Sequence, residues 1–256
     1  MNVVCDLDGV IYRGGVALPG VSAALEQLAE ADANVFFITN NSTRTADSTA
    51  EKISRVTGFG VTGSQVLTSG MAAMTMLDSE DQPVFVVGEA GLRAEVESAG
   101  LALTDDAIRA RSVVVGLTRS LSYGLIADAM RAIRNGARFI ATNDDSSFPT
   151  EDGLAPGCGA IVAAIAVSSD AVPEVAGKPN PPMRSLIESK LNGPAWMIGD
   201  RLDTDIALAQ GQPGWRSVLV LTGITSREAS QGSDADFVLE DFAAAVDLVL
   251  HHEDPS

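Results

Sequence analysis

The fold is decided by the opening stretch Val3-Val4-Cys5-Asp6-Leu7-Asp8-Gly9-Val10, in which an apolar run passes directly into two carboxylates and a glycine. Val3 to Asp6 is predicted to be a short buried strand. Ligands of open α/β sheets bind beyond the carboxyl ends of the strands, so Asp6 and Asp8 fall where chemistry is expected. One carboxylate can act as nucleophile and metal ligand while the other serves as general acid and base. The alternative is an ordinary acidic turn, because Asp-Gly is common in turns.

Strand, loop and helix patterns alternate along the chain, which predicts a parallel sheet covered by helices. The predicted strands are residues 3–6, 35–39, 66–67, 84–87, 112–116, 138–141, 195–199 and 217–221, with a short one near Phe237. The predicted helices are residues 20–30, 45–56, 69–77, 89–99, 122–135 and 157–167, and one that begins near Pro182. Polar breaks at residues 78–83 and 168–175 bracket a self-contained α/β block of about 90 residues, the size of an inserted domain.

Composition narrows the class of protein. The 256 residues carry a formal net charge of −17, which disfavours nucleic-acid polymers and anionic membrane surfaces as partners. No stretch approaches the ~20 apolar residues that cross a bilayer, and the chain opens directly into a strand, so we expect a cytoplasmic location.

The two cysteines are expected to be small buried residues and not a zinc site. His251 and His252, the only histidines, are expected to be solvated, which leaves a Ser-His-Asp hydrolase without a base.

A second apolar strand, residues 195–199, ends in a run of carboxylates that includes Asp200, Asp203 and Asp205. Mg²⁺ prefers about six oxygen ligands and takes one or two carboxylates, so Asp6 and Asp200 would form a sparse magnesium site. The alternative is a helix N-cap, filled by Asp200 or Asp203, with Asp205 in the first turn. We favour the cap for Asp203 and the site for Asp200.

Two further segments offer phosphate contacts. Lys178 is one of only three lysines and lies between Gly177 and Pro179, where its ammonium can neutralise a phosphate oxygen or a carboxylate. Thr39-Asn40-Asn41-Ser42 follows the second strand, and a hydroxyl with backbone N–H groups at such a turn can hold phosphate oxygens. The alternatives are a solvated loop lysine and an ordinary polar turn.

Taken in order, these segments resemble the haloacid dehalogenase superfamily, and more narrowly its NagD-like (4-nitrophenylphosphatase-like) branch. Asp6-Leu7-Asp8-Gly9-Val10 looks like the first motif, Thr39-Asn40-Asn41-Ser42 the second and Gly177-Lys178-Pro179 the third. The fourth is Gly199 to Asp205, and Ala141-Thr142-Asn143-Asp144 and Pro156 to Ala160 also match. The resemblance spans residues 3 to about 225, and the ordered set of motifs is far more specific than any one of them.

The resemblance implies a Rossmann-like core, residues 1–80 and 174–256, with an inserted α/β cap at residues 81–173. It implies that Asp6 is the nucleophile that forms an aspartyl-phosphate and that Asp8 is the general acid and base. Mg²⁺ would be held by the Asp6 carboxylate, the Asp8 backbone carbonyl and the Asp200 carboxylate. The remaining implied contacts are Thr39, Asn40, Asn41 and Lys178 to the phosphoryl group, and Asp205 to Lys178 or a metal-bound water.

The cap would select the substrate. Asn143 and Asp144 follow a predicted cap strand and are candidate substrate contacts, with a structural turn as the alternative. Pro156-Gly157-Cys158-Gly159 is interpreted as structural.

The expected activity is Mg²⁺-dependent hydrolysis of a small phosphomonoester, because a closing cap excludes macromolecules. Nucleoside monophosphates, glycerol 3-phosphate, phosphoglycolate, pyridoxal phosphate and sugar phosphates are all compatible substrates, and a homodimer is a compatible assembly. The alternatives are a phosphomutase and a non-catalytic ligand-binding protein on the same scaffold. A dehydrogenase would need Gly-x-Gly-x-x-Gly after the first strand, which residues 6–15 do not supply.

Overall fold

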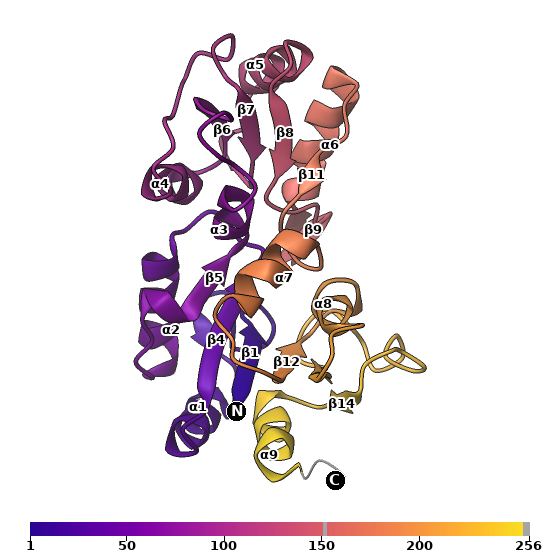
Figure 1. Ribbon diagram of the computed structural model, residues 1–256. Coiled ribbons are helices and arrows are strands. Elements are labelled where there is room, and N and C mark those ends of the chain that lie inside the picture. The colour runs from indigo at the N-terminus through magenta and orange to yellow at the C-terminus, as the bar shows by residue number, and fades with distance from the viewer. Residues whose placement is uncertain (151–152, 253–256) are drawn as a thin grey trace. The chain divides into compact units, whose positions relative to one another are not determined.

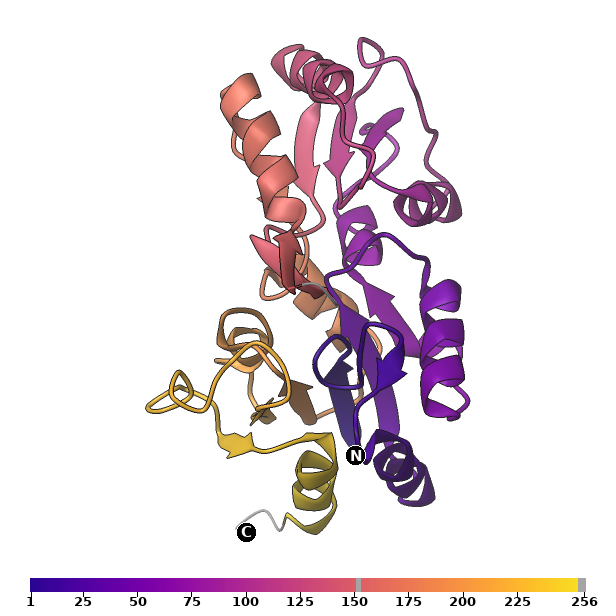
Figure 2. The same cartoon turned by 180° about the vertical axis from the view of Figure 1, so that it is seen from behind.

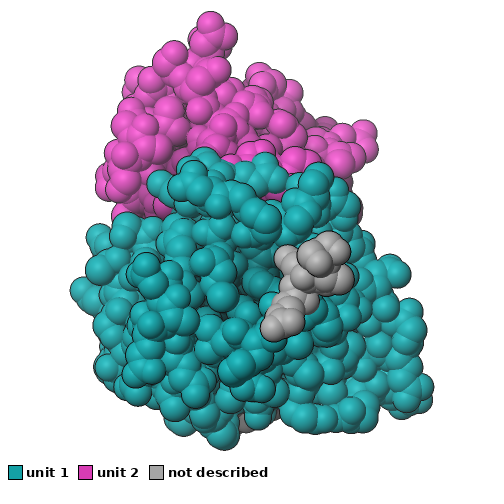
Figure 3. All heavy atoms as spheres, turned by 60° about the horizontal axis from the view of Figure 1, so that its bottom comes forward, with its two compact units in different colours: residues 1–39, 46–67, 187–256 teal, residues 40–45, 68–186 magenta. Residues whose placement is uncertain are grey.

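The computed structural model describes residues 1–150 and 153–252. The chain divides into two compact units, which Figure 3 colours separately. The first unit comprises Met1–Thr39, Ala46–Leu67 and Ile187–Ser256, and the second comprises Asn40–Thr45 and Thr68–Leu186.

The first unit is built on a six-stranded sheet with the strand order β14-β13-β12-β1-β4-β5 (Figure 1). Its strands are β1 (Asn2–Asp6), β4 (Asn34–Thr39), β5 (Val66–Thr68), β12 (Ala195–Gly199), β13 (Trp215–Val220) and β14 (Phe237–Leu239). β1 runs parallel to both of its neighbours, β4 and β12, and β13 and β14 continue the parallel order. The helices of this unit are α1 (Val21–Glu30), α2 (Ala46–Thr57) and α9 (Phe242–His251), with the short helices η1 (Gly63–Gln65), η2 (Leu202–Ile206) and α8 (Ala207–Ala209). A small hairpin is formed by β2 (Tyr12–Arg13) and β3 (Val16–Ala17).

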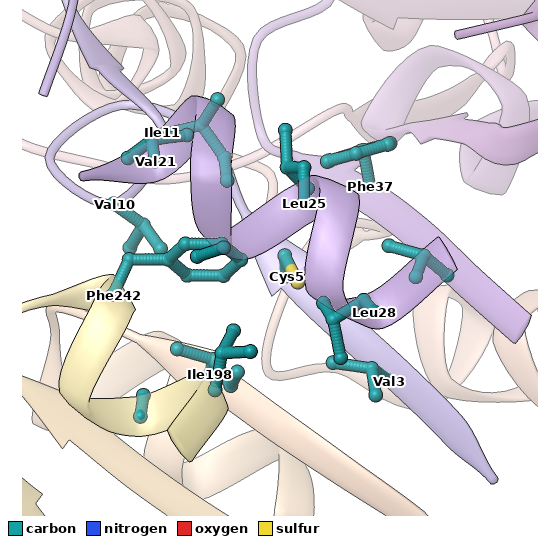
Figure 4. Close-up of a cluster of buried hydrophobic side chains, with 14 of the residues drawn as sticks. Val3, Cys5, Val10, Ile11, Val21, Leu25, Leu28, Phe37, Ile198 and Phe242 are labelled. Atoms are coloured by element: carbon teal, nitrogen blue, oxygen red, sulfur yellow. The ribbon is translucent and has the colours of Figure 1, made fainter. Parts of the chain in front are cut away.

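Successive side chains of β1 point to opposite faces of the sheet, and those on one face belong to the core of this unit. All five residues of β1 are buried, as expected of a central strand with both faces covered. Val3 and Cys5 point into a cluster formed with α1, α2 and α9, whereas Val4 points to the opposite face. Figure 4 shows Phe242, from the first turn of α9, lying between Val10 and Ile198 in this cluster.

The two helices that cover the centre of this face form for local reasons. In α1 the apolar residues Val21, Ala24, Leu25 and Leu28 recur at helical spacing and are all buried. In α9 the Asp241 side chain accepts a hydrogen bond from the Ala244 N–H (2.9 Å), which satisfies one of the free donors of the first turn.

The second unit is built on a four-stranded parallel sheet with the order β11-β8-β7-β6. Its elements are α3 (Ser69–Met74), β6 (Val84–Val87), α4 (Ala90–Ser98), β7 (Ser112–Val115), α5 (Tyr123–Arg134), β8 (Arg138–Ala141), β9 (Ser147–Thr150), β10 (Gly153–Pro156), α6 (Cys158–Ser169), β11 (Glu174–Val175) and most of α7 (Pro181–Glu188). Residues of α5 and α6 share one apolar cluster with β6, β7 and β8, so these two helices cover the same face of the sheet (Figure 2).

The predicted α/β fold with parallel sheets is confirmed. The sequence patterns did not predict the hairpins β2–β3 and β9–β10, the helix α9 or the two-residue strand β11. β11 pairs with β8 in the smaller sheet, although the predicted core segment begins at residue 174. The domain boundaries at 80/81 and 173/174 stay a prediction.

The structure tests the burial predicted for the two cysteines and the solvent exposure predicted for the two histidines. Cys5 and Cys158 are free thiols and both are buried, as predicted, and burial raises the pKa of the Cys158 thiol to about 12. His251 is exposed, but the prediction of a solvated His252 is wrong, because its ring meets the rings of Trp196 and Phe237 edge-on with centroids 5.2 and 5.4 Å apart.

Among the helices of the described residues, none is long and apolar enough to cross a membrane.

Phe242→Ala should lower the free energy of unfolding of the first unit by about 3–5 kcal/mol, because it empties a fully packed site in the core. Both tryptophans, Trp196 and Trp215, lie in this unit, so urea unfolding followed by tryptophan fluorescence reports on it directly. Val16→Ala is the control, since Val16 is 72% exposed and its truncation should change the free energy by less than about 0.5 kcal/mol. Equal effects of the two substitutions would show that Phe242 does not anchor α9.

Candidate active site

The site begins at the point where the strand order of the larger sheet reverses. β1 lies at its centre, with β4 on one side and β12 on the other, and the chain leaves all three strands at the same edge (Figure 1). Cys5 pairs with Ile198, so Asp6 and Asp200 leave adjacent strand ends. Asp6 itself pairs with Ile38, one residue before Thr39, which is buried. Three predicted residues thus come from neighbouring strand ends at a topological switch point, where α/β sheets bind ligands.

Three carboxylates gather at this edge. Asp6, Asp200 and Asp205 each contribute one oxygen, these oxygens lie within 4.8 Å of one another, and all three residues are buried. Buried like charges at such separations require protons or a cation between them. The donor set is made of hard carboxylate oxygens, which Mg²⁺ and Ca²⁺ prefer, so the residues present fit a hard divalent cation.

Asp205 also accepts hydrogen bonds from the backbone of the turn that follows β12. Its Oδ2 accepts hydrogen bonds from the N–H groups of Asp200 and Arg201, each at 3.1 Å. A Cβ on Gly199 would collide with the Asp205 side chain, so glycine is required there. Asp205 therefore fixes the turn that carries Asp200.

The N-cap predicted for Asp203 is wrong. Arg201 occupies the N-cap position of η2, and Asp203 lies within the first turn. Its carboxylate forms a two-point ion pair with the Arg201 guanidinium (3.0 and 2.7 Å), and 70% of the Asp203 side chain is exposed. The N–H groups of Asp205 and Ile206, which a cap at Asp203 would satisfy, donate to the Arg201 carbonyl oxygen instead (3.2 and 3.1 Å).

Asp8 lies in a tight turn directly after Asp6 and is half-buried. The N–H of Gly9 donates to the Tyr12 carbonyl (2.9 Å), which fixes the peptide plane between Asp8 and Gly9. Gly9 has φ +94°, a conformation that favours glycine. The backbone that carries Asp8, two residues after Asp6, therefore has a defined conformation.

In the second unit, Asn40 organises the backbone around Lys178. The Asn40 Oδ1 accepts from the Lys178 N–H (2.8 Å), and its Nδ2 donates to the Lys178 carbonyl and to Asp145 Oδ2 (3.2 Å each). A Cβ on Gly177 would lie 2.5 Å from Asn40 Oδ1 and from the Thr142 carbonyl oxygen, so only glycine fits. Lys178 is 3% exposed, which excludes the alternative of a solvated loop lysine.

The other predicted residues of this unit make mainly local contacts. Asn143 is buried, and its Nδ2 donates to the Asn40 carbonyl (2.7 Å). Asp144 is exposed. Asn41 is also exposed, and its Oδ1 accepts from the N–H and Oγ1 of Thr43 at 2.9 and 2.7 Å, which is the hydrogen bonding of a polar turn.

The glycines at the start of α6, Gly157 at its N-cap and Gly159 in its first turn, make structural contacts, as interpreted from the sequence. The N–H of Gly159 donates to the Asp145 carbonyl (2.9 Å), and a Cβ on Gly157 or Gly159 would collide with the backbone of residues 144–145. These contacts fix the loop that carries Asp144 and Asp145.

Sequence reasoning missed two groups of residues. Asp145 was overlooked although it adjoins Asn143 and Asp144, because only its contact with Asn40 distinguishes it from other loop acids. Thr222 to Thr225 contact Asp200 and the Gly9 turn. The available signal was their position after β13, the same signal that identified Thr39 and Asp200.

Comparisons with known proteins identify the family of the chain. Residues 3–102 match the family model described as haloacid dehalogenase-like hydrolase, and residues 175–245 match a second model of HAD-hydrolase-like proteins. The chain is 36% identical over 230 residues to the 5'-nucleotidase YutF of Bacillus subtilis, covering 87% of this chain and 88% of that protein.

Two solved structures have the same fold at similar identity. Glycerol phosphate phosphatase of Mycobacterium tuberculosis, in complex with magnesium, superposes with a TM-score of 0.87 at 32% identity, covering 96% of this chain and 75% of that one. NagD of Escherichia coli gives a TM-score of 0.83 at 33% identity, covering 94% and 96%. The predicted resemblance is confirmed, and the chain belongs to the haloacid dehalogenase-like hydrolases, in the branch that contains NagD and related phosphatases.

Proposed function

We propose that the chain hydrolyses small phosphomonoesters with Mg²⁺ as cofactor and Asp6 as covalent nucleophile. The observation that carries the proposal is the buried group of Asp6, Asp200 and Asp205 at the switch point of the sheet. The names of the relatives support it, because they describe phosphatases of a nucleotide and of glycerol phosphate, one of them in complex with magnesium.

In the proposed mechanism an Asp6 carboxylate oxygen attacks phosphorus and the bond to the ester oxygen breaks. Asp8 gives its proton to the departing alcohol. Asp8 then takes a proton from water, whose oxygen attacks the phosphorus of the aspartyl-phosphate and releases phosphate and free Asp6. Mg²⁺, held by the Asp6 and Asp200 carboxylates and the Asp8 carbonyl, would neutralise charge on the phosphoryl oxygens.

We propose that Thr39, Asn40, Asn41 and Lys178 hold the phosphoryl group. Because the Asn40 amide is engaged with the Lys178 backbone and with Asp145, we assign it a positioning role and assign phosphate binding to the backbone N–H groups of residues 40 and 41. Lys178 supplies the positive charge that a protein of net charge −17 must concentrate locally to bind an anion. Asp205 supports the site by fixing the turn of Asp200.

For the substrate we propose a class of compounds, and for its contact with the cap we propose a candidate residue. Asp144 is exposed and is the better candidate for a substrate contact, whereas Asn143 is committed to the Asn40 carbonyl. Nucleoside monophosphates, glycerol 3-phosphate and sugar phosphates form the proposed class. The cytoplasmic location and the homodimer stay predictions.

Asp6→Asn should abolish phosphate release, because a neutral amide does not attack phosphorus. We would measure phosphate released from a panel of phosphomonoesters, including 4-nitrophenyl phosphate, with Mg²⁺ and with EDTA. Glu26→Gln, an exposed acid on α1, is the matched control and should keep wild-type rates.

Release by Asp6→Asn at the wild-type rate would refute the covalent mechanism. A wild-type protein that is folded but releases phosphate from no ester would favour the phosphomutase, which needs a sugar bisphosphate, or the binding protein.

Asp200→Asn should weaken Mg²⁺ binding by more than about a hundredfold, because loss of a partner one shell further out already costs 10–100-fold. Isothermal titration with Mg²⁺ measures this without turnover. Asp203→Asn is the matched control three residues along the same segment, since Asp203 is exposed and paired with Arg201. Equal affinities in Asp200→Asn and the wild type would place the ion elsewhere.

Lys178→Ala should lower kcat by about 10²–10³-fold, the loss typical for removal of one charge-stabilising donor. Lys190→Ala, at an exposed lysine, is the control. Steady-state kinetics on the best ester of the panel separates the two roles of Lys178. A raised KM at unchanged kcat would show that Lys178 only assists ground-state binding.

A further inference from the structure

The loop from Thr222 to Thr225 lies beside the predicted metal ligands without belonging to a predicted motif. It follows β13, which pairs with β12 in register from Ala195↔Trp215 to Gly199↔Leu219. Because the two strands are parallel and adjacent, the loop leaves the sheet at the same edge as Asp200.

This loop hydrogen bonds to Asp200 through its backbone. The Ile224 N–H donates to Asp200 Oδ2 (2.7 Å), and the Thr225 N–H donates to the Asp200 carbonyl oxygen (3.1 Å). Asp200 is 1% exposed, so these donors replace water. A peptide N–H bound to one oxygen restricts the rotation of this carboxylate, which limits the directions in which its other oxygen can bind a cation.

Two glycines allow this approach. A Cβ on Gly223 would collide with the Asp200 carboxylate, and a Cβ on Gly9 would lie 2.7 Å from Asp200 Oδ2 and 3.0 Å from the Gly223 Cα. The turn after Asp8, the end of β12 and the loop after β13 are therefore in direct contact around one carboxylate.

Thr222 ties this loop to the turn that carries Asp6 and Asp8. Its Oγ1 donates to the Gly9 carbonyl oxygen (2.5 Å), and its own carbonyl accepts from Arg13 Nη2 (2.5 Å), on the β2–β3 hairpin. The Gly9 N–H is bound to Tyr12, so the turn is held from both sides.

We infer that Thr222 is a positioning residue for the metal site. Its hydroxyl holds the Asp6–Gly9 turn at a fixed separation from Asp200, whose carboxylate is bound by the same loop two residues later. The inference rests on the proposed function, since it concerns residues that would bind Mg²⁺. It assigns a role in ion affinity to a side chain that is not among the predicted metal ligands.

The test is titration of the full chain with Mg²⁺ alone, with no phosphate compound present. Thr222→Val removes the hydroxyl at constant shape and should weaken Mg²⁺ binding about tenfold, the lower end of the effect of an outer-shell partner. Thr222→Ser restores the donor and should return the affinity to within about twofold of the wild type. If Thr222→Val does not fold, Thr222→Ala takes its place, because it adds no atom.

Ser217→Ala is the matched control. The Ser217 hydroxyl lies in the first half of the same strand, β13, and donates to Asp236 Oδ2 (2.8 Å), whereas Thr222 follows the end of that strand. Urea unfolding should show that both substitutions destabilise the chain, but Ser217→Ala should leave Mg²⁺ affinity unchanged.

Wild-type affinity in folded Thr222→Val or Thr222→Ala overturns the inference, as does an equal loss in Ser217→Ala, which would indicate general loosening. Failure of the wild type itself to bind Mg²⁺ would instead overturn the proposed function, and with it the inference.

Discussion

Repulsion among three buried carboxylates is the constraint on which the site depends. Asp6, Asp200 and Asp205 bring their oxygens within 4.8 Å of one another in a chain of net charge −17. Backbone N–H groups offset part of this repulsion, because Asp205 accepts from two of them and Asp200 from a third. The remainder favours a bound cation, which is why the arrangement is informative about chemistry and not only about folding.

The fold accommodates these carboxylates because glycines let the backbone approach the aspartate side chains closely. Gly9, Gly199 and Gly223 each leave room for an aspartate side chain where any Cβ would intrude. Behind them β1 is buried along its whole length, and Phe242 and Ile198 pack beneath it. A rigid apolar base therefore supports polar loops whose positions are set by hydrogen bonds.

Much of this was predictable, because it depends on local pattern. The strands that end at Asp6, at Thr39 and just before Asp200 are recognisable from apolar runs followed by polar residues, and parallel pairing then places their ends at one edge. The strands of the hairpin β2–β3 were missed because they have two residues each. Those of the hairpin β9–β10 were missed because each contains a proline, which argues against a strand. Asp203 was misassigned because N-cap composition does not reveal that Arg201 would claim its carboxylate.

The contacts that could not be predicted join residues far apart in the sequence. Asn40 and Lys178 are 138 positions apart, and Thr222 and Gly9 are 213 apart. In each case an uncharged side chain bonds to the backbone beside a charged residue, and nothing in the local sequence marks such a partner. Charged groups of an active site are visible as motifs because the chemistry dictates their type. The groups that position them need only one donor or acceptor at the right place, so many residue types serve and only the folded geometry identifies them.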